Sequence, residues 1–288
     1  MKKYYSLKII VSLISIILIA CTKFESNEKT IKDPIEVSLH PYVGRLVTVN
    51  ALVGDDSLKL LFDTGGGKTF IGSDVARRLG CEPSGRSIGF RMNGEMVESK
   101  YCHNIAITIG GVSFQHDNIG VWDINSVLPE DFPPLDGILS LKTFLNQPFT
   151  LDLSSNHLIF ESEKSLNERI KRMTKLESRI ATGPDGSELT VFLHGRIKDY
   201  GWFLIDSGNL DVFLVSHHFA ENIQNDSTTS TSTWESEFTF KNFLSSLTRF
   251  RTKEIIYDGV ISEEFLRKWI FTFELYTNSV WIEPVASK

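Results

Sequence analysis

The sequence is poor in the residues and patterns that mark several common functional classes. It contains only three cysteines in 288 residues, and no His/Cys cluster has the spacing of a zinc site. The adjacent pair His217-His218 suits chelation poorly, because neighbouring residues of a strand point to opposite faces. No glycine-rich phosphate loop precedes a helical pattern. We therefore expect neither a metal nor a cofactor.

The chain also lacks a large excess of charge of either sign. Its 30 Lys and Arg residues stand against 36 Asp and Glu residues, which gives a net charge of −6. Without a basic excess, nucleic acid is not expected as a partner. Hydrophobic residues make up 41% of the chain and charged residues 23%, which is typical of a globular protein with a core.

The N-terminus has an apolar run that is short for a membrane span. This run, from Ile9 to Ala20, follows three lysines and has the length of a signal-peptide core. We therefore expect a signal peptide over residues 1–20. Ala20 stands directly before Cys21, as in the lipobox of bacterial lipoproteins, so Cys21 is expected to be lipidated. The alternative is an ordinary secretory signal in which Cys21 is incidental.

The polar segment 21–34 is expected to be a lipidated flexible tether. This arrangement places the protein in the bacterial cell envelope, lipid-anchored and extracytoplasmic, facing the periplasm or the surface. Export would permit a disulfide between the two remaining cysteines, Cys81 and Cys102. Two free, semi-buried thiols are the alternative.

Two segments of the chain repeat each other. Leu60–Gly65 reads LLFDTG and Phe203–Gly208 reads FLIDSG, so an apolar strand runs into Asp-Thr/Ser-Gly in each. The strands before them also correspond, at residues 46–49 and 189–192. All these matches keep one offset of 143 residues. Such self-similarity indicates a duplicated structural unit.

A second block repeats with a different offset. Leu135–Ser140 reads LDGILS and Tyr257–Ser262 reads YDGVIS, 122 residues later. The second half is therefore the same unit with 21 fewer residues between its two blocks. Asp136 and Asp258, within these blocks, are expected to be exposed turn residues before an apolar strand.

The two repeated blocks resemble those of the retropepsin-like aspartic peptidases, in particular bacterial two-lobed members with both halves on one chain. The resemblance covers Ile35 to Pro284. It implies a mostly β fold of two similar closed β lobes, related by a pseudo-twofold axis, with short helices such as 73–80. The expected division is an N-terminal lobe at 35–163, a helical linker at 164–180 and a C-terminal lobe at 181–284.

By this resemblance Asp63 and Asp206 form a catalytic pair. Two carboxylates held together cannot both ionise easily, so they share a proton. One can then act as general base to a water molecule while the other polarises the scissile carbonyl. Hydroxyls that bond to the opposite loop, and glycines that let the loops approach, support the pair. These supporting residues are Thr64, Gly65, Ser207 and Gly208.

A hairpin between the two blocks of the first half is expected to act as a flap. Asn93-Gly94 is a favoured hairpin turn, and residues 88–91 and 96–99 flank it. The flap residues are Met92, Asn93, Gly94 and Glu95. A surface hairpin without a lid function is the alternative. The shorter second half has the polar run 227–233 instead, so we expect one flap.

The expected function is that of an aspartic endopeptidase, a hydrolase acting on a polypeptide in extended conformation. One chain supplies both carboxylates, so a monomer is sufficient for the site. Four residues depart from the family pattern: Gly66, Asn209, which is bulkier than the usual Ala or Ser, and the serines Ser140 and Ser262 that stand where the family has glycine. These departures support the alternative of a catalytically inactive peptide- or protein-binding lipoprotein that retains the fold.

Overall fold

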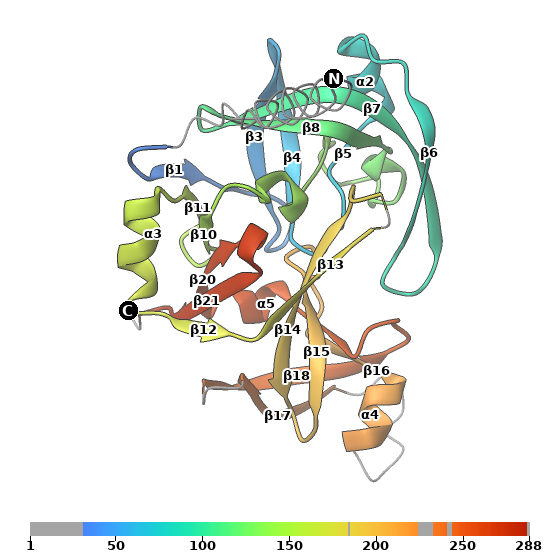
Figure 1. The fold of residues 1–288 in the computed structure, drawn as a ribbon. Helices are drawn as coiled ribbons and strands as arrows, with labels where there is room; N and C mark the ends of the chain where they lie inside the picture. Colours follow the sequence, from blue (N-terminus) through green and yellow to red (C-terminus); the bar gives the residue numbers. More distant parts are fainter. Residues whose placement is uncertain (1–30, 184, 224–232, 241–243, 287–288) are drawn as a thin grey trace, which may run out of the picture. The chain divides into compact units, whose positions relative to one another are not determined.

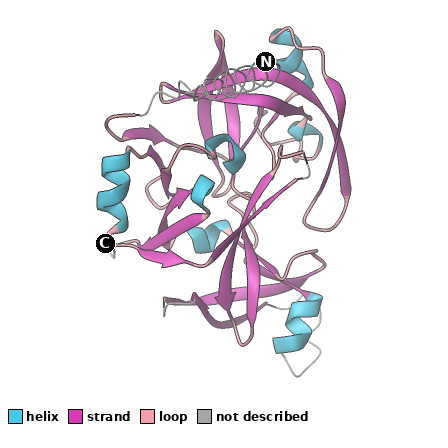
Figure 2. Cartoon of the chain, viewed as in Figure 1, coloured by secondary structure: helices cyan, strands magenta, loops and turns pink. Residues whose placement is uncertain are grey.

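The computed structural model describes residues 31–183, 185–223, 233–240 and 244–286, and these are mostly β-strand (Figures 1 and 2). The described residues from Lys32 onward belong to one compact unit. The predicted signal peptide 1–20, the lipidation site Cys21 and most of the tether 21–34 lie outside the described residues. So does nearly all of the polar run 227–233.

The first half of the unit forms an eight-stranded sheet. Its strands are β2 (His40–Pro41), β3 (Val47–Val53), β4 (Asp56–Asp63), β5 (Phe70–Ile71), β6 (Ser84–Phe90), β7 (Met96–Ile109), β8 (Val112–Val121) and β9 (Gly137–Ser140). Their order is β2-β3-β4-β9-β5-β8-β7-β6. An additional pairing of β3 with β7, at Leu52 and Thr108, closes six of these strands into a ring.

The second half forms a seven-stranded sheet with the same pattern of pairing. Its strands are β13 (Ser178–Thr182), β14 (Leu189–Arg196), β15 (Tyr200–Ile205), β16 (Phe213–Ser216), β17 (Thr233–Phe240), β18 (Ser245–Lys253) and β19 (Gly259–Ile261). Their order is β13-β14-β15-β19-β16-β18-β17, and β14 also pairs with β17. β15 is parallel to β19 as β4 is to β9, and β16 is parallel to β18 as β5 is to β8.

A third sheet takes strands from both halves. It contains β1 (Ile35–Ser38), β10 (Phe149–Asp152), β11 (His157–Phe160), β12 (Thr174–Leu176), β20 (Trp269–Glu274) and β21 (Ser279–Pro284). Their order is β1-β11-β10-β20-β21-β12, so the halves meet where β10 pairs with β20. The β10–β11 and β20–β21 turns contain Asn156 and Asn278, whose φ angles of 59° and 51° are left-handed. The equivalent turns are thus built alike.

The helices are short. They are α2 (Ser73–Arg78), α3 (Glu163–Ile170), α4 (His217–Ile223) and α5 (Glu263–Leu266), with 3-10 turns η1 (Ile124–Ser126), η2 (Leu141–Phe144) and η3 (Leu275–Thr277). The helix expected at 73–80 is α2. The linker expected to be helical over 164–180 is helical only as far as Ile170. The rest forms β12 and β13, because pairing with β21 and β14 overrides local helix propensity. No described helix is long and apolar enough to cross a membrane.

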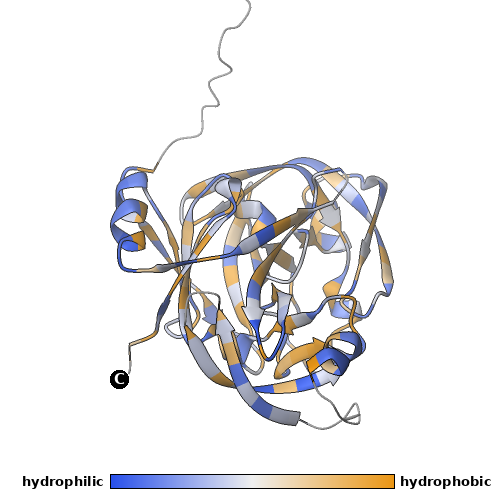
Figure 3. Cartoon of the chain, turned by 60° about the horizontal axis from the view of Figure 1, so that its bottom comes forward, coloured by the Kyte–Doolittle hydropathy of each residue, from blue (hydrophilic) through white to orange (hydrophobic). Residues whose placement is uncertain are grey.

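The core follows from the alternation of side chains along the strands (Figure 3). On β14, for example, Leu189, Val191 and Leu193 are fully buried, while the residues between them are only half-buried. Phenylalanine supplies the largest core side chains. The largest fully buried side chains are Phe62, Phe144, Phe149, Phe160, Phe203, Phe213, Phe238, Phe240, Phe250, Phe265, Phe271 and Phe273.

The repeated Asp-Gly pairs are structural. A Cβ on Gly137 would lie 2.1 Å from the Phe70 carbonyl oxygen, so only glycine lets β9 cross β5 this closely. Asp136 and Asp258 are half-buried, which corrects the prediction that they are exposed turn residues. Their carboxylates accept hydrogen bonds from the backbone N–H groups of Lys59 and Trp202, at 2.8 Å each. Each aspartate thus satisfies a donor on the strand beside it.

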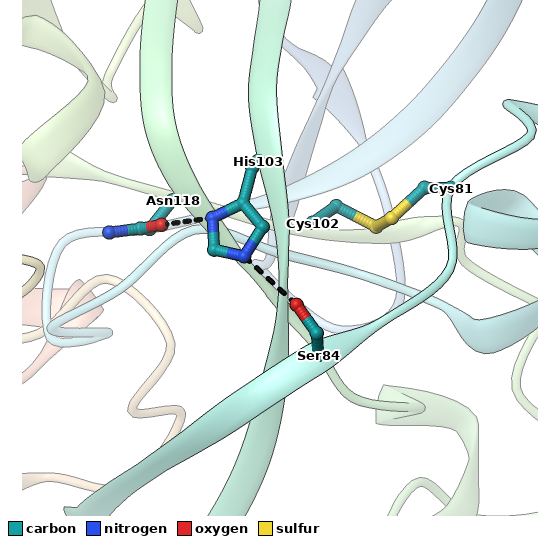
Figure 4. Close-up of a disulfide and its surroundings, with 5 residues drawn as sticks. All are labelled: Cys81, Ser84, Cys102, His103 and Asn118. Carbon is teal, nitrogen blue, oxygen red and sulfur yellow. Dashed lines mark hydrogen bonds between the residues drawn. A yellow bond between two sulfur atoms is a disulfide. The ribbon is translucent and has the colours of Figure 1, made fainter.

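A disulfide joins Cys81 to Cys102, with their Cα atoms 5.9 Å apart (Figure 4). The two cysteines therefore form a disulfide and are not two free, semi-buried thiols. Cys102 is buried on β7, and Cys81 follows α2, so the bond ties the end of that helix to the long strand. Next to it, His103 lies between Ser84 and Asn118, with hydrogen-bond distances of 3.0 and 2.6 Å.

We predict that replacing both cysteines with serine lowers the free energy of unfolding by about 3 kcal/mol, because the bond closes a loop of 21 residues. Urea denaturation of the wild type and the Cys81→Ser, Cys102→Ser variant would measure the loss. The wild type in the presence of a reductant is the control and should match the variant. Identical midpoints for the oxidised wild type and the variant would contradict the prediction.

Candidate functional site

The two Asp-Thr/Ser-Gly loops meet at the ends of β4 and β15. Ser207 donates its backbone N–H to the Thr64 hydroxyl oxygen at 2.9 Å, and Thr64 donates its N–H to the Ser207 hydroxyl oxygen at 3.0 Å. The hydroxyls donate in turn to backbone carbonyls beyond the loops, Thr64 to Ile205 at 3.2 Å and Ser207 to Phe62 at 3.0 Å. Both side chains are buried. Four hydrogen bonds therefore join the loops reciprocally, and we call this arrangement the loop junction.

Glycine permits the close approach at the loop junction. A Cβ on Gly65 would lie 2.4 Å from Cγ of Asp206, and one on Gly208 would lie 3.0 Å from Oδ1 of Asp63. Any side chain at Gly65 would therefore displace the opposite carboxylate. Gly66 is almost as confined, since its Cβ would lie 3.1 Å from Oδ2 of Asp63.

The carboxylates of Asp63 and Asp206 lie side by side, because a Cβ on Gly208 would lie 3.0 Å from Oδ1 of Asp63 and 3.1 Å from Oδ1 of Asp206. Asp63 Oδ1 also accepts the N–H groups of Gly65 and Gly66 at 2.9 and 3.1 Å. Asp206 Oδ1 accepts the N–H of Gly208 at 2.8 Å. The structure thus brings together all six residues that the sequence assigned to the pair and its support.

Burial raises the pKa of both carboxyl groups. The effect is larger for Asp206, which is 7% exposed and whose pKa the charge of Asp63 raises further. The backbone donors of Gly66 and Gly65 oppose the rise in the pKa of Asp63. A pair of this kind retains one proton where isolated aspartates have lost both. It therefore offers a neighbouring group one donor and several acceptors.

The serines that depart from the family pattern are accommodated behind the loops. Ser140 is fully buried, and both its backbone N–H and its hydroxyl lie 3.1 Å from the Thr69 hydroxyl oxygen. Thr69 also contacts the Thr143 hydroxyl at 2.8 Å. Ser262 is buried as well and precedes α5. Neither serine disturbs the loop junction.

The predicted flap residues form the turn between β6 and β7. Arg91 donates its N–H to the Glu95 carbonyl at 2.9 Å, and Gly94 adopts a φ of 81°. The tip reaches the second half of the chain, where the carbonyl of Met92 accepts the N–H of Ile256 at 2.9 Å. The Met92 side chain packs on a cluster of second-half residues: Leu204, Leu214, Ile255 and Val260. The hairpin therefore bridges the two halves.

Tyr257 directly follows Ile256, the residue that donates to the hairpin tip. It packs against the same apolar cluster as Met92. Burial raises the pKa of the Tyr257 hydroxyl, and the charges of Glu188 and Asp206 raise it further. The hairpin residue Gly89 is close to Glu188, because its Cβ would lie 3.1 Å from Oε1. Tyr257 thus belongs to the apolar cluster on which the hairpin tip rests, and Glu188 lies beside the hairpin strand β6.

Lys68 is a site residue that sequence reasoning missed. It is 3% exposed, and its ammonium group donates to the hydroxyl of Ser87 on β6 and to that of Tyr101 on β7, the latter at 3.3 Å. It also lies 3.7 Å from Glu188 of the second half. The sequence did contain a signal for it: a lysine stands directly after Gly65-Gly66-Gly67, just before an apolar segment that forms a buried strand. Lys68 joins the first loop to the stem of the hairpin.

The second half has no strand equivalent to β6 among its described residues, where β17 pairs with β18 and β14. This agrees with the placement of the 21-residue difference in the hairpin region. Within ranges 31–183, 185–223, 233–240 and 244–286, no group of three or more His, Cys, Asp or Glu side chains is arranged to hold a metal ion.

Comparisons with known proteins show the fold alone. No family model and no curated protein matches the chain. Among solved structures it is similar to basic 7S globulin from soybean, with a TM-score of 0.54 and 10% identity. It is equally similar to conglutin gamma, a basic 7S globulin from lupine seeds, with a TM-score of 0.54 and 11% identity. Each likeness covers 88% of this chain and 95% of the other.

These findings overturn the predicted membership of the retropepsin-like aspartic peptidases. The two similar structures named above are globulins, and no family model or curated protein supports a peptidase assignment. The predictions of an aspartic endopeptidase and of hydrolase activity are wrong on the same ground. The physical reason lies in what the motif encodes. Thr64, Ser207 and the adjacent glycines are required to join two loops, so their repetition predicts the loop junction without predicting turnover.

We predict that Thr64→Val and Ser207→Ala each lower the free energy of unfolding by about 1–3 kcal/mol, because each leaves a buried backbone N–H unpaired. The free energy lost by the double variant should be smaller than the sum of the two single losses, because the first substitution already separates the loops. Urea denaturation of all four proteins would measure this. Thr190→Val, at a half-buried position on β14, is the control. Single losses no larger than that of the control would contradict the role of the junction.

The raised pKa of Asp206 predicts a pH dependence of stability. Between its unfolded pKa, about 3.9, and its higher folded pKa, the native protein holds a proton that the unfolded chain releases. Stability from this group is therefore present at low pH and is lost as pH rises. Asp206→Asn should flatten that decline between pH 4 and pH 7.

The measurement is urea denaturation of wild type and Asp206→Asn at several pH values. His116 gives the opposite trend, because burial lowers its folded pKa to about 4 and stability rises as the unfolded histidine deprotonates. Comparing the two proteins cancels that contribution, since both contain His116. Parallel stability curves would contradict the prediction for Asp206.

Proposed function

We propose that this protein binds an extended segment of a peptide or protein without cleaving it, at a site centred on Asp63 and Asp206. The observation that supports this most is the pair of adjacent carboxylates at the loop junction, together with a hairpin whose tip bridges the two halves of the chain. The likeness to globulins gives no support for turnover. We therefore assign the pair a binding role.

The chemistry of the pair suits a polypeptide backbone. One carboxyl group keeps its proton and can donate, while the other carboxylate oxygens accept. A peptide group carries one donor and one acceptor and can satisfy both. Because Asp206 is buried and Asp63 half-buried, a hydrogen bond to them is made in a medium of reduced polarity and contributes more than one at the surface.

The hairpin would take part in binding. It is held in place by the Met92–Ile256 backbone hydrogen bond at its tip and by Lys68 at its stem. A ligand that reaches the carboxylates would displace the first of these contacts. The extended conformation is proposed because a strand can pair with the backbone of a neighbouring hairpin strand.

The finer architecture belongs to the same proposal. We propose two similar closed β lobes, at 35–163 and 181–284, related by a pseudo-twofold axis. Its support is that equivalent residues exchange contacts: Thr64 with Ser207 at the loop junction, and Thr150 with Thr272, whose hydroxyls lie 2.7 Å apart between β10 and β20. One chain contains both lobes, so a monomer would suffice for binding.

The cellular setting is proposed from the sequence alone. Residues 1–20 would be removed as a signal peptide, Cys21 would carry lipid, and residues 21–34 would tether the binding domain to the bacterial cell envelope outside the cytoplasm. The disulfide is compatible with such an oxidising location.

The proposal predicts that the purified full chain, solubilised in detergent and immobilised, captures octapeptides from a degenerate library. Mass spectrometry would identify them and show them intact. Asp206→Asn should bind the captured peptides about tenfold more weakly, because a hydrogen bond to a charged group contributes about 1.5–3 kcal/mol. Asp55→Asn, in an exposed turn, is the matched control and should bind as the wild type does.

Two results would contradict this proposal. Peptide fragments that appear with the wild type and not with Asp63→Asn would show turnover, which a binding protein lacks. Equal affinity of Asp206→Asn and the wild type would place binding elsewhere on the molecule.

A further inference from the structure

A second region with unusual side chains lies on the outer face of β14 and β15, which are side by side in Figure 1. Leu193 on β14 and Phe203 on β15 point into the core. Because side chains alternate along a strand, the neighbouring residues His194 and Trp202 point outward. His194 pairs across the strands with Trp202, and Arg196 pairs with Tyr200.

These outward side chains form a continuous stack. The guanidinium of Arg179, on β13, lies 3.8 Å from the Trp202 ring centre. Trp202 lies 4.9 Å from His194, which stacks on Tyr200 at 5.1 Å and an interplanar angle of 12°. Arg196 lies 5.7 Å from the Tyr200 ring. We call these five residues the stacked row; an arginine stands at each end.

Both arginines of the stacked row are exposed, and neither has an acidic partner among the ion pairs of the described residues. An arginine stacked through its face keeps its N–H edge free for a carboxylate. The ring edges between the two arginines are also electropositive, because aromatic rings carry positive charge at their edges. The row therefore favours oxygen atoms along its length. β13 is the end strand of its sheet, so no strand of the described part of the chain lies beyond Arg179.

The surroundings select the kind of anion. Glu177 lies 3.4 Å from His194, and Asp199 accepts the N–H of Tyr200 at 2.8 Å, so two carboxylates flank the stacked row. The chain as a whole carries a charge of −6. A uniformly charged polymer such as polyphosphate would be repelled by these groups. A polypeptide with two carboxylates separated by uncharged residues would not.

We propose that the stacked row is a docking surface for an extended segment of another polypeptide with acidic residues near its two ends. The successive distances along the row place the arginines at most about 20 Å apart. An extended chain covers about 17 Å in five residues, so acidic side chains five positions apart would reach both. This surface shares no residue with Asp63, Asp206 or the hairpin and does not depend on the function proposed for them.

The test uses a fluorescent decapeptide of threonine and valine with glutamates five positions apart, and a copy with glutamines. Fluorescence anisotropy with the detergent-solubilised full chain should show tighter binding of the glutamate peptide than of the glutamine copy, and the difference should shrink at high salt. Arg179→Gln and Arg196→Gln should each weaken it about fivefold, and the two effects should multiply in the double variant. Arg77→Gln, at an exposed site on α2, is the matched control and should change nothing.

Two further variants separate the role of the stacked arginine from that of its charge, and this surface from the carboxylate site. Arg179→Lys retains the charge and loses the planar stack, so it should bind more weakly than the wild type and more tightly than Arg179→Gln. Asp206→Asn should keep the difference in affinity between the glutamate peptide and the glutamine copy, which separates this surface from the carboxylate site. No binding by the wild type, or equal binding by the double variant and Arg77→Gln, would overturn the proposal. So would tighter binding of polyphosphate that the same arginine variants abolish.

Discussion

The reciprocal hydrogen bonds between Thr64 and Ser207 are the constraint on which the rest of the site depends. Each loop supplies a hydroxyl that satisfies a backbone donor of the other, so neither loop can keep its conformation alone. The carboxylates of Asp63 and Asp206 follow from this contact, because each is the residue before the exchanged hydroxyl. Their burial and raised pKa values are therefore consequences of how the halves are joined.

The equivalent strands and the loop junction could be predicted from the sequence, because each is encoded in both halves of the chain. The offsets of 143 and 122 residues identified the equivalent strands, and the paired Asp-Thr/Ser-Gly segments predicted that Thr64 and Ser207 would meet. The Asn-Gly turn predicted the hairpin from local residues alone, because Asn-Gly favours a tight hairpin turn. The step from these residues to a peptidase failed, because a motif that joins loops has a structural use of its own.

The features that the sequence did not reveal depend on contacts between distant, unrepeated residues. Lys68 has no basic counterpart in the second half, and its partners Ser87 and Glu188 come from separate segments. The backbone contact of Met92 with Ile256 leaves no trace in residue type. Asp136 was expected in solvent. Its partner, the N–H of Lys59, is brought to it by strand pairing, which the local sequence does not reveal.

The sheet shared by the two halves has a consequence for folding. β10 and β20 pair through residues 122 positions apart, as Thr150 with Thr272. Contacts this remote in sequence form slowly, because a long loop must close first. Until the second half arrives, β10 presents an unpaired edge that can join another chain. A protein of this design therefore benefits from completing its second half before the first has time to associate with its neighbours.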